Sequence, residues 1–185
     1  MRLDHIAYRT ADRIKTAQFF IDVFGYSIQT EFEPIFSDGT SQGVKCIALE
    51  PPEKFKGEKL HEFSWMHTYE CPGFKQEFHL APEIFVSDGP PTSIVGKWVA
   101  ERGGIGSIHH CAYQVNDVQK VMNEWKDKGY AEFASEEPFK CENLIQIFSK
   151  PSLVTGLIFE LIQRDNYGFC AESVAKLMES SQDFK

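Results

Sequence analysis

Hydrophobic and polar positions follow one strand–helix–strand pattern in the first half of the chain. Leu3–Thr10 reads as a short strand, and Ala11–Phe24 carries apolar residues at helical spacing until Gly25 ends it. Two more strand-like runs follow, at 26–34 and 44–49, with a turn-rich segment at 37–43 between them. After a long polar stretch, Phe78–Ser87 resumes as a strand interrupted by Pro82. The first half therefore predicts a β-α-β-β-β order.

The same order returns in the second half. Ser107–Val115 (SIHHCAYQV) repeats the pattern of LDHIAYRT, and Asn116 or Asp117 can cap a helix with an apolar stripe, Val118, Val121, Met122 and Trp125. Strands are predicted at about 131–135, 144–149 and 157–163, and a last helix at about 172–181. The repeat predicts an α+β fold of two paired βαβββ modules, whose curved mixed sheet is closed by a C-terminal helix.

These patterns divide the chain into four parts. The first module spans 1–92 and carries an insertion at about 50–77, which is too long for a structureless loop in a compact domain. A connecting helix and a GGIG hinge occupy 93–106, the second module 107–164, and the closing helix 165–185. The insertion is expected to be a lid, an interface, or a segment with structure of its own.

Composition narrows the functional classes. A net charge of −8 without a Lys/Arg stripe argues against nucleic acid, and no stretch is apolar enough to span a bilayer. The chain enters its first strand directly from Met1 without a leader, so we expect a cytoplasmic location with no membrane partner. The five cysteines are widely spaced and contain no CxxC pair, which favours reduced thiols over a disulfide framework.

Aligning HIAY with HCAY places His5 and His110 at the same position of the two modules. Strand alternation puts His110 on one face with Ile108 and Ala112, and His109 on the opposite face. A lone histidine is usually satisfied by ordinary hydrogen bonds, but a histidine repeated at one position of two modules favours a functional role.

Glu160 lies in LIFELIQ, where an unpaired carboxylate facing an apolar interior costs several kcal/mol. Its partner is either a basic side chain such as Arg164 or a metal ion. Two histidines and a carboxylate from three strands form the ligand set that leaves one face of an iron(II)-type ion open. The three residues His5, His110 and Glu160 are therefore candidate metal ligands.

The paired modules with these residues resemble the vicinal oxygen chelate superfamily, which includes glyoxalases, bleomycin-resistance proteins and dioxygenases. Within it, GGIGSIHHCA, LIQIFSKP and FELIQRDNYGFC resemble the catalytic half of 4-hydroxyphenylpyruvate dioxygenases. That resemblance implies a metal-dependent oxygenase acting on a 2-keto acid, with iron(II) held by His5, His110 and Glu160. Cobalt, nickel, zinc and manganese are the alternative ions, and a homodimer is a further expectation.

The resemblance also implies a substrate site. Gln146 matches a glutamine that lines it, and Phe148 and Phe169 match two phenylalanines that sandwich an aromatic ring. Each is equally explained as an ordinary core or hydrogen-bonding residue. Cys46 stands where the dioxygenase has a pocket serine, and Val95 near a second glutamine that contacts the keto acid. At these two positions the sequence departs from the dioxygenase pattern.

An alternative reading comes from the last strand of the first module. By symmetry Glu83, or else His79, corresponds to Glu160. With Glu83 as a fourth ligand or as a base, the site resembles methylmalonyl-CoA epimerase and glyoxalase I, which move protons next to a metal-bound oxygen. A third reading is a protein of the same fold that only binds small molecules. The dioxygenase is our first hypothesis and the epimerase its alternative, and in every reading the partner is a small molecule.

Overall fold

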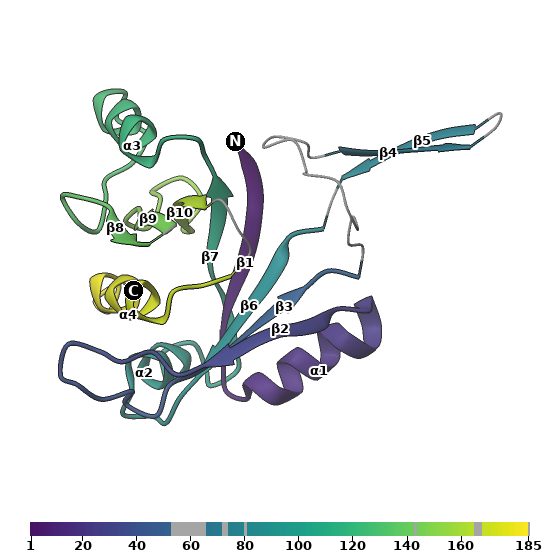
Figure 1. The fold of residues 1–185 in the computed structure, drawn as a ribbon. Helices are drawn as coiled ribbons and strands as arrows, with labels where there is room; N and C mark the ends of the chain where they lie inside the picture. The colour runs from purple at the N-terminus through teal and green to yellow at the C-terminus, as the bar shows by residue number, and fades with distance from the viewer. Residues whose placement is uncertain (53–65, 72–73, 80, 143, 165–167, 185) are drawn as a thin grey trace.

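The computed structural model describes most of the chain as one curved sheet with helices on both sides (Figure 1). The described residues are 1–52, 66–71, 74–79, 81–142, 144–164 and 168–184. Its strands are β1 (Arg2–Thr10), β2 (Ser27–Phe32), β3 (Lys45–Glu50), β4 (Met66–Cys71), β5 (Phe74–His79), β6 (Glu83–Asp88), β7 (Gly106–Gln114), β8 (Phe139–Cys141), β9 (Leu144–Phe148) and β10 (Ile158–Arg164). Its helices are α1 (Arg13–Phe24), α2 (Ile94–Ala100), α3 (Val118–Asp127) and α4 (Ala171–Ser180).

The two modules meet at the centre of one eight-stranded sheet. Its strand order is β2-β3-β6-β1-β7-β10-β9-β8. The first strands of the modules, β1 and β7, pair antiparallel, and each pairs in parallel with the last strand of its own module, β6 or β10. The order is therefore symmetric about the β1–β7 pair, which confirms the predicted α+β fold of paired βαβββ units.

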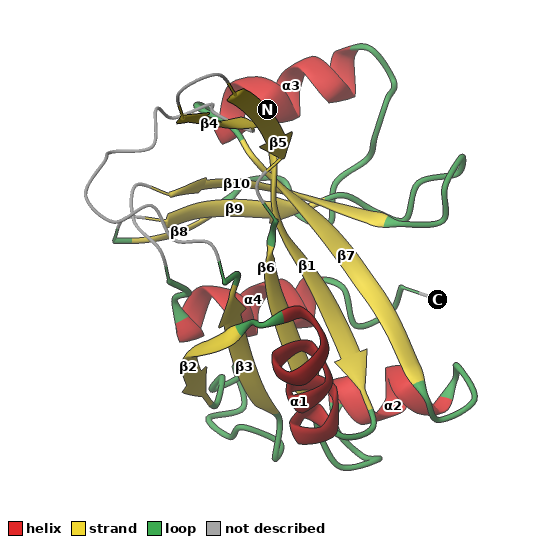
Figure 2. Ribbon diagram, turned by 90° about the vertical axis from the view of Figure 1, so that its right-hand side faces the viewer, coloured by secondary structure: helices red, strands yellow, loops and turns green. Residues whose placement is uncertain are grey.

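Helices cover the two faces of the sheet differently (Figures 1 and 2). On the outer face, α1 packs through Ala17 on the first half, and α3 packs through Met122 on the second half. On the inner face, α2 and α4 share a core with β1, β3 and β6. Leu177 of α4 also packs on Phe148 and Ile158 of the second half. The closing helix thus contacts both modules from inside the curl of the sheet.

Local sequence signals fix the ends of the first helix in each module. The Asp12 side chain accepts a hydrogen bond from the Lys15 amide, and Asp117 does the same with Lys120. Gly25 then ends α1 in the left-handed conformation, with φ of 73°. The predicted apolar stripe of α1 is only partly buried, since Ile14 and Phe24 remain about half exposed.

The insertion contains β4 and β5, which form a separate two-stranded sheet that extends away from the main sheet (Figure 1). Residues 53–65 lie outside the described part of the chain. The predicted strand Phe78–Ser87 is wrong as one element, because β5 ends at His79 and β6 begins at Glu83. Pro82 lies in this break, and its missing N–H does not favour an uninterrupted strand.

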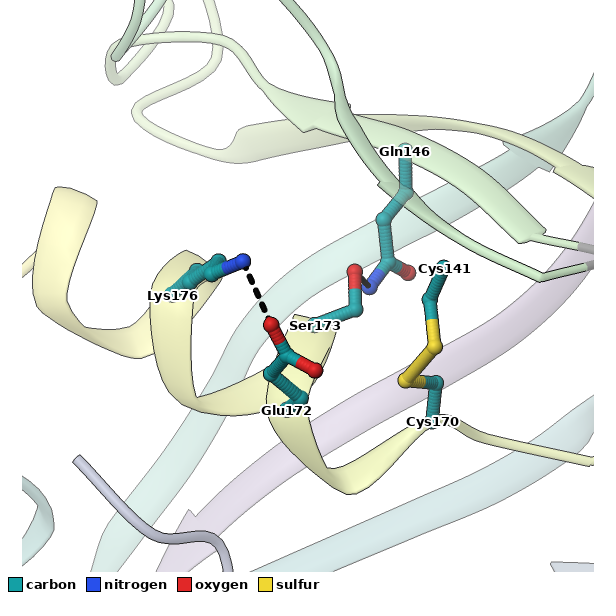
Figure 3. The surroundings of a disulfide bond; sticks show 6 residues. All are labelled: Cys141, Gln146, Cys170, Glu172, Ser173 and Lys176. Carbon is teal, nitrogen blue, oxygen red and sulfur yellow. Dashed lines mark hydrogen bonds and ion pairs between the residues drawn. A yellow bond between two sulfur atoms is a disulfide. The ribbon is translucent and has the colours of Figure 1, made fainter. Parts of the chain in front are cut away.

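Two further expectations are wrong. The segment 131–135 forms only an isolated bridge between Phe133 and Ser149, and the strand of this region is the short β8. Cys141 and Cys170, expected as reduced thiols, form a disulfide between β8 and the start of α4 (Figure 3). Sequence spacing missed this bond because the fold, and not the spacing, brings the two Cα atoms within 6.5 Å. None of the helices in the described residues combines the length and apolar character of a membrane span.

Candidate metal centre

Three strands at the centre of the sheet bring His5, His110 and Glu160 together. In the register of β1 and β7, Ala112 is opposite His5, and it also pairs with Glu160 of β10. The His5 and His110 Nε2 atoms lie 3.3 Å apart, and Glu160 Oε2 lies 3.3 Å from the first and 3.0 Å from the second. All three residues are buried. The predicted candidate ligands therefore converge on one point.

These distances suit a divalent metal. Ligand atoms about 2.0–2.2 Å from an ion, at right angles to one another, lie about 2.8–3.1 Å apart. The observed separations of 3.0–3.3 Å need only a small adjustment to reach that geometry. Glu160 Oε1 is also buried and has no hydrogen-bond partner in the described part of the chain, as expected where an ion or a substrate group completes its environment. Two imidazoles and one carboxylate fit an ion with open coordination positions.

Two β-bulges hold the histidine rings. The β1–β7 register skips Asp4 between Leu3 and His5, and skips His109 between Ile108 and His110. In each module the extra residue immediately precedes the candidate ligand and contacts its ring. Asp4 Oδ1 lies 2.8 Å from His5 Nδ1, and His109 Nδ1 lies 2.8 Å from His110 Nδ1. Such partners fix the tautomer of a ligating histidine, so Nε2 is free to face an ion.

Burial and charge together set the protonation of the site. Burial alone would lower the pKa of His5, but the Glu160 and Asp4 carboxylates outweigh it and raise this pKa to about 9. Burial would raise the pKa of Glu160, but the two histidines hold it at about 2. Burial lowers the pKa of His110, and the hydrogen bond with Glu160, which raises this pKa, offsets only part of the effect. In the absence of an ion, a proton on His5 therefore balances the Glu160 charge.

Glu83, the predicted fourth ligand or base, belongs to a different network. Arg164 Nη2 lies 2.8 Å from Glu83 Oε2 and 2.7 Å from Asp4 Oδ1, and all three side chains are nearly buried. Burial would lower the pKa of Arg164, but the two carboxylates raise it. Glu83 is thus held in an ion pair beside the site, and through Asp4 the same arginine supports the orientation of His5.

A cavity opens beside the three candidate ligands. All three candidate ligands contribute side chains to its lining. The predicted substrate residues Gln146, Phe148 and Phe169 line it. Phe169 lies with its ring centroid 5.0 Å from His5, and Phe148 4.6 Å from His110. Gln146 Nε2 donates to Ser173 Oγ at 2.6 Å, which links β9 to α4 (Figure 3).

Other expected residues lie elsewhere. Cys46 and Val95 are buried in the core between β3, α2 and α4 and do not line the cavity. His79 is on β5, in the separate sheet, and its side chain lies outside what the structure describes. The expectation that His109 faces away from His110 is wrong, because the bulge shifts the strand alternation and His109 lines the same cavity.

Sequence reasoning missed several residues of the site. Asp4, Arg9 and Phe85 were not singled out. The α4 residues Val174, Leu177 and Met178, predicted as the apolar stripe of the closing helix, do line the cavity. A usable signal was present for two of the missed residues. Asp4 and Arg9 are charged residues in a short strand that is otherwise suited to burial, and such residues are rarely buried without a partner.

The fold is shared with several solved structures. No family model matches the sequence, and none of the curated proteins matches it either. A selenomethionyl methylmalonyl-CoA epimerase superposes with a TM-score of 0.63 at 22% identity, covering 89% of this chain and 95% of that one. The chain has the fold of these epimerases. Because the identity is below 25%, the similarity concerns the fold alone.

Two other structures give the same picture. The Streptomyces coelicolor methylmalonyl-CoA epimerase matches with a TM-score of 0.59 at 21% identity, over 90% of this chain and 99% of that chain. A hypothetical protein from Bacillus halodurans matches with a TM-score of 0.60 at 19% identity, over 91% and 98%. These structures share the fold of this chain, while a specific likeness to 4-hydroxyphenylpyruvate dioxygenase is not shown.

Proposed function

We propose that this chain is a metal-dependent enzyme that moves a proton on a small substrate, in the class of epimerases and isomerases. The convergence of His5 Nε2, His110 Nε2 and Glu160 Oε2 carries the proposal. The fold shared with methylmalonyl-CoA epimerases supports it, and one of these structures is a complex with 2-nitronate-propionyl-CoA. A bound divalent ion would act as a Lewis acid on a substrate carbonyl and so acidify the neighbouring C–H bond.

The proton acceptor we propose is Glu160. Its Oε2 faces the two histidines, whereas its Oε1 has no hydrogen-bond partner among the described residues and would take the substrate proton. His109 Nδ1 lies 2.8 Å from His110 Nδ1, so when it accepts the His110 proton this imidazole has no free acceptor nitrogen. Gln146 has no ionisable proton and can only orient a bound group. Glu83 is held by Arg164 and does not line the cavity.

The test is metal-dependent exchange of a substrate α-proton. Protein loaded with cobalt, manganese or zinc is incubated in deuterated water with methylmalonyl and 2-keto acid thioesters or free acids, and loss of the α-proton is followed by NMR. We expect exchange in the wild type, none in Glu160→Gln, and exchange retained in Glu83→Gln, which is also a buried carboxylate. Absence of exchange in every metal-loaded sample would refute the proposal.

A second function is favoured by one observation. Because Glu83 pairs with Arg164, the described residues offer three metal ligands, the number that leaves room for a chelated 2-keto acid and dioxygen on iron(II). Phe148 and Phe169 at the cavity also suit an aromatic substrate. Dioxygen uptake by the iron(II) protein with an aryl-pyruvate, without α-proton exchange, would establish this oxygenase in place of the isomerase.

A further inference from the structure

Arg9 is a buried cation at the cavity with no carboxylate partner in the described part of the chain. Its side chain lines the cavity and the residue is only 3% exposed. Its Nη1 atom has no hydrogen-bond partner, and Nη2 makes one long hydrogen bond of 3.4 Å to Ser181 Oγ. Arginine is almost never buried in this way unless it is paired. The contrast with Arg164 is direct, since that equally buried guanidinium holds two carboxylates.

Among the residues that the structure describes, the charged neighbour of Arg9 is a second cation. Arg102 lies close enough to oppose its charge, and burial and this neighbour lower the pKa of Arg9 to about 9. Arg9 therefore remains a cation at neutral pH. Trp98 is near both arginines, with its ring centroid 5.7 Å from the Arg9 guanidinium carbon and 3.9 Å from that of Arg102. A cation–π contact at the longer distance offsets only part of the desolvation of a buried charge.

His109, which also lies near Trp98, supplies a second donor without a partner among the described residues. Its ring centroid lies 5.5 Å from that of Trp98, and its Nε2 is buried with no hydrogen-bond partner among the residues that the structure describes. When His110 turns Nε2 toward an ion, its Nδ1–H donates to His109 Nδ1, which leaves the hydrogen of His109 on Nε2. Arg9 Nη1 and His109 Nε2 then both lack an acceptor, and both residues line one cavity.

We propose that Arg9 and His109 form a subsite for a carboxylate of the substrate, separate from the group that the metal holds. A guanidinium and an imidazole N–H donor suit the two oxygens of a carboxylate. The subsite lies four residues along β1 from His5, toward α2 and α4. The substrate class is therefore an acid whose carboxylate reaches Arg9 while its carbonyl or second carboxylate reaches the metal site. This inference rests on the proposed metal site but not on the proposed reaction.

The backbone around Arg9 is built for close packing. Gly106 opens β7 opposite Thr10 with φ of 89°, and a Cβ at this position would lie 2.1 Å from the Arg9 carbonyl oxygen. Only glycine fits both the conformation and the contact. The GGIG segment, read from the sequence as a hinge, therefore fixes the strand end that carries Arg9.

The test compares binding of succinate and propanoate to zinc-loaded and metal-free protein by calorimetry. In the zinc-loaded wild type we expect succinate to bind more tightly than propanoate, since it has one carboxylate for each position. Arg9→Met should weaken succinate about 10- to 100-fold and remove this preference, as for loss of a charged hydrogen bond. Arg13→Met is the matched control, because Arg13 pairs with Asp88 away from the cavity, and should bind as the wild type does.

Two further measurements keep the proposal open to refutation. A cation without a partner destabilises the empty protein, so Arg9→Met should raise the melting temperature without ligand, whereas loss of a purely structural arginine would lower it. If Arg9→Met does not fold, the Arg9 Nε–H resonance of the wild type, assigned with Arg9→Lys, should still shift on titration with succinate. Unchanged succinate binding in Arg9→Met, or no shift of that resonance, would overturn the subsite. Metal-free protein that binds propanoate through Arg9 would retain the subsite even if no isomerase activity is found.

Discussion

Metal binding at this site should depend steeply on pH, because a proton on His5 competes with the ion. Without metal, the Glu160 and Asp4 carboxylates outweigh burial and raise the pKa of His5 to about 9. Below that pH the His5 imidazole is protonated, and it must lose the proton before it can ligate. Apparent affinity should therefore fall about tenfold for each pH unit below 9, or about 100-fold between pH 8.5 and 6.5, equivalent to about 2.7 kcal/mol.

Competition of zinc or cobalt against a chromophoric chelator of known pH dependence measures this slope. A weakly buffered solution with an indicator dye measures the proton released, which should approach about one per ion at neutral pH. Asp4→Asn removes one of the two carboxylates that raise the pKa of His5, so it should release fewer protons and flatten the slope near pH 8. Affinity that stays constant from pH 6.5 to 8.5, with no proton released, would refute the reasoning.

Three other changes test the packing around the site. Arg164→Met leaves Asp4 and Glu83 buried without their cation and should cost about 3–5 kcal/mol in urea unfolding, so an unchanged midpoint would contradict the network. Replacing Cys141 and Cys170 by serine removes a disulfide that links residues 29 positions apart. It should lower the free energy of unfolding by roughly 3–4 kcal/mol and leave the metal content unchanged. Equal stability of the oxidised wild type and this variant would argue against the bond. Truncation after Arg164 removes α4 from the core and should give insoluble protein, whereas a soluble, active product would make the helix dispensable.

Strand and helix periodicity was enough to predict the modules and the three candidate ligands. His5 and His110 occupy one position of a repeated pattern, and Glu160 is a carboxylate in an apolar strand, so each could be read locally. The paired strands β1 and β7 then place them together through register alone. Features carried by one periodic element were therefore predictable.

The remaining features depend on contacts between distant segments. A bulge adds one residue to a strand, and nothing in the stretches LDHIAYRT and SIHHCAYQV shows that Asp4 and His109 are such residues. Glu83 was placed by symmetry, but the ion pair it makes with Arg164 depends on how β6 and β10 lie relative to β1. The disulfide between β8 and α4 likewise requires the closing helix to be in place. Strand alternation and spacing contain none of this information.

Metal content of protein purified without chelator tests the central claim most directly. We compare the wild type with Glu160→Gln, and with Glu83→Gln as a control that changes an equally buried carboxylate on the same sheet. The three-ligand site predicts about one divalent ion per chain in the wild type and in Glu83→Gln, and less than about a tenth of that in Glu160→Gln. A full complement of metal in Glu160→Gln, or its loss in Glu83→Gln alone, would contradict the account.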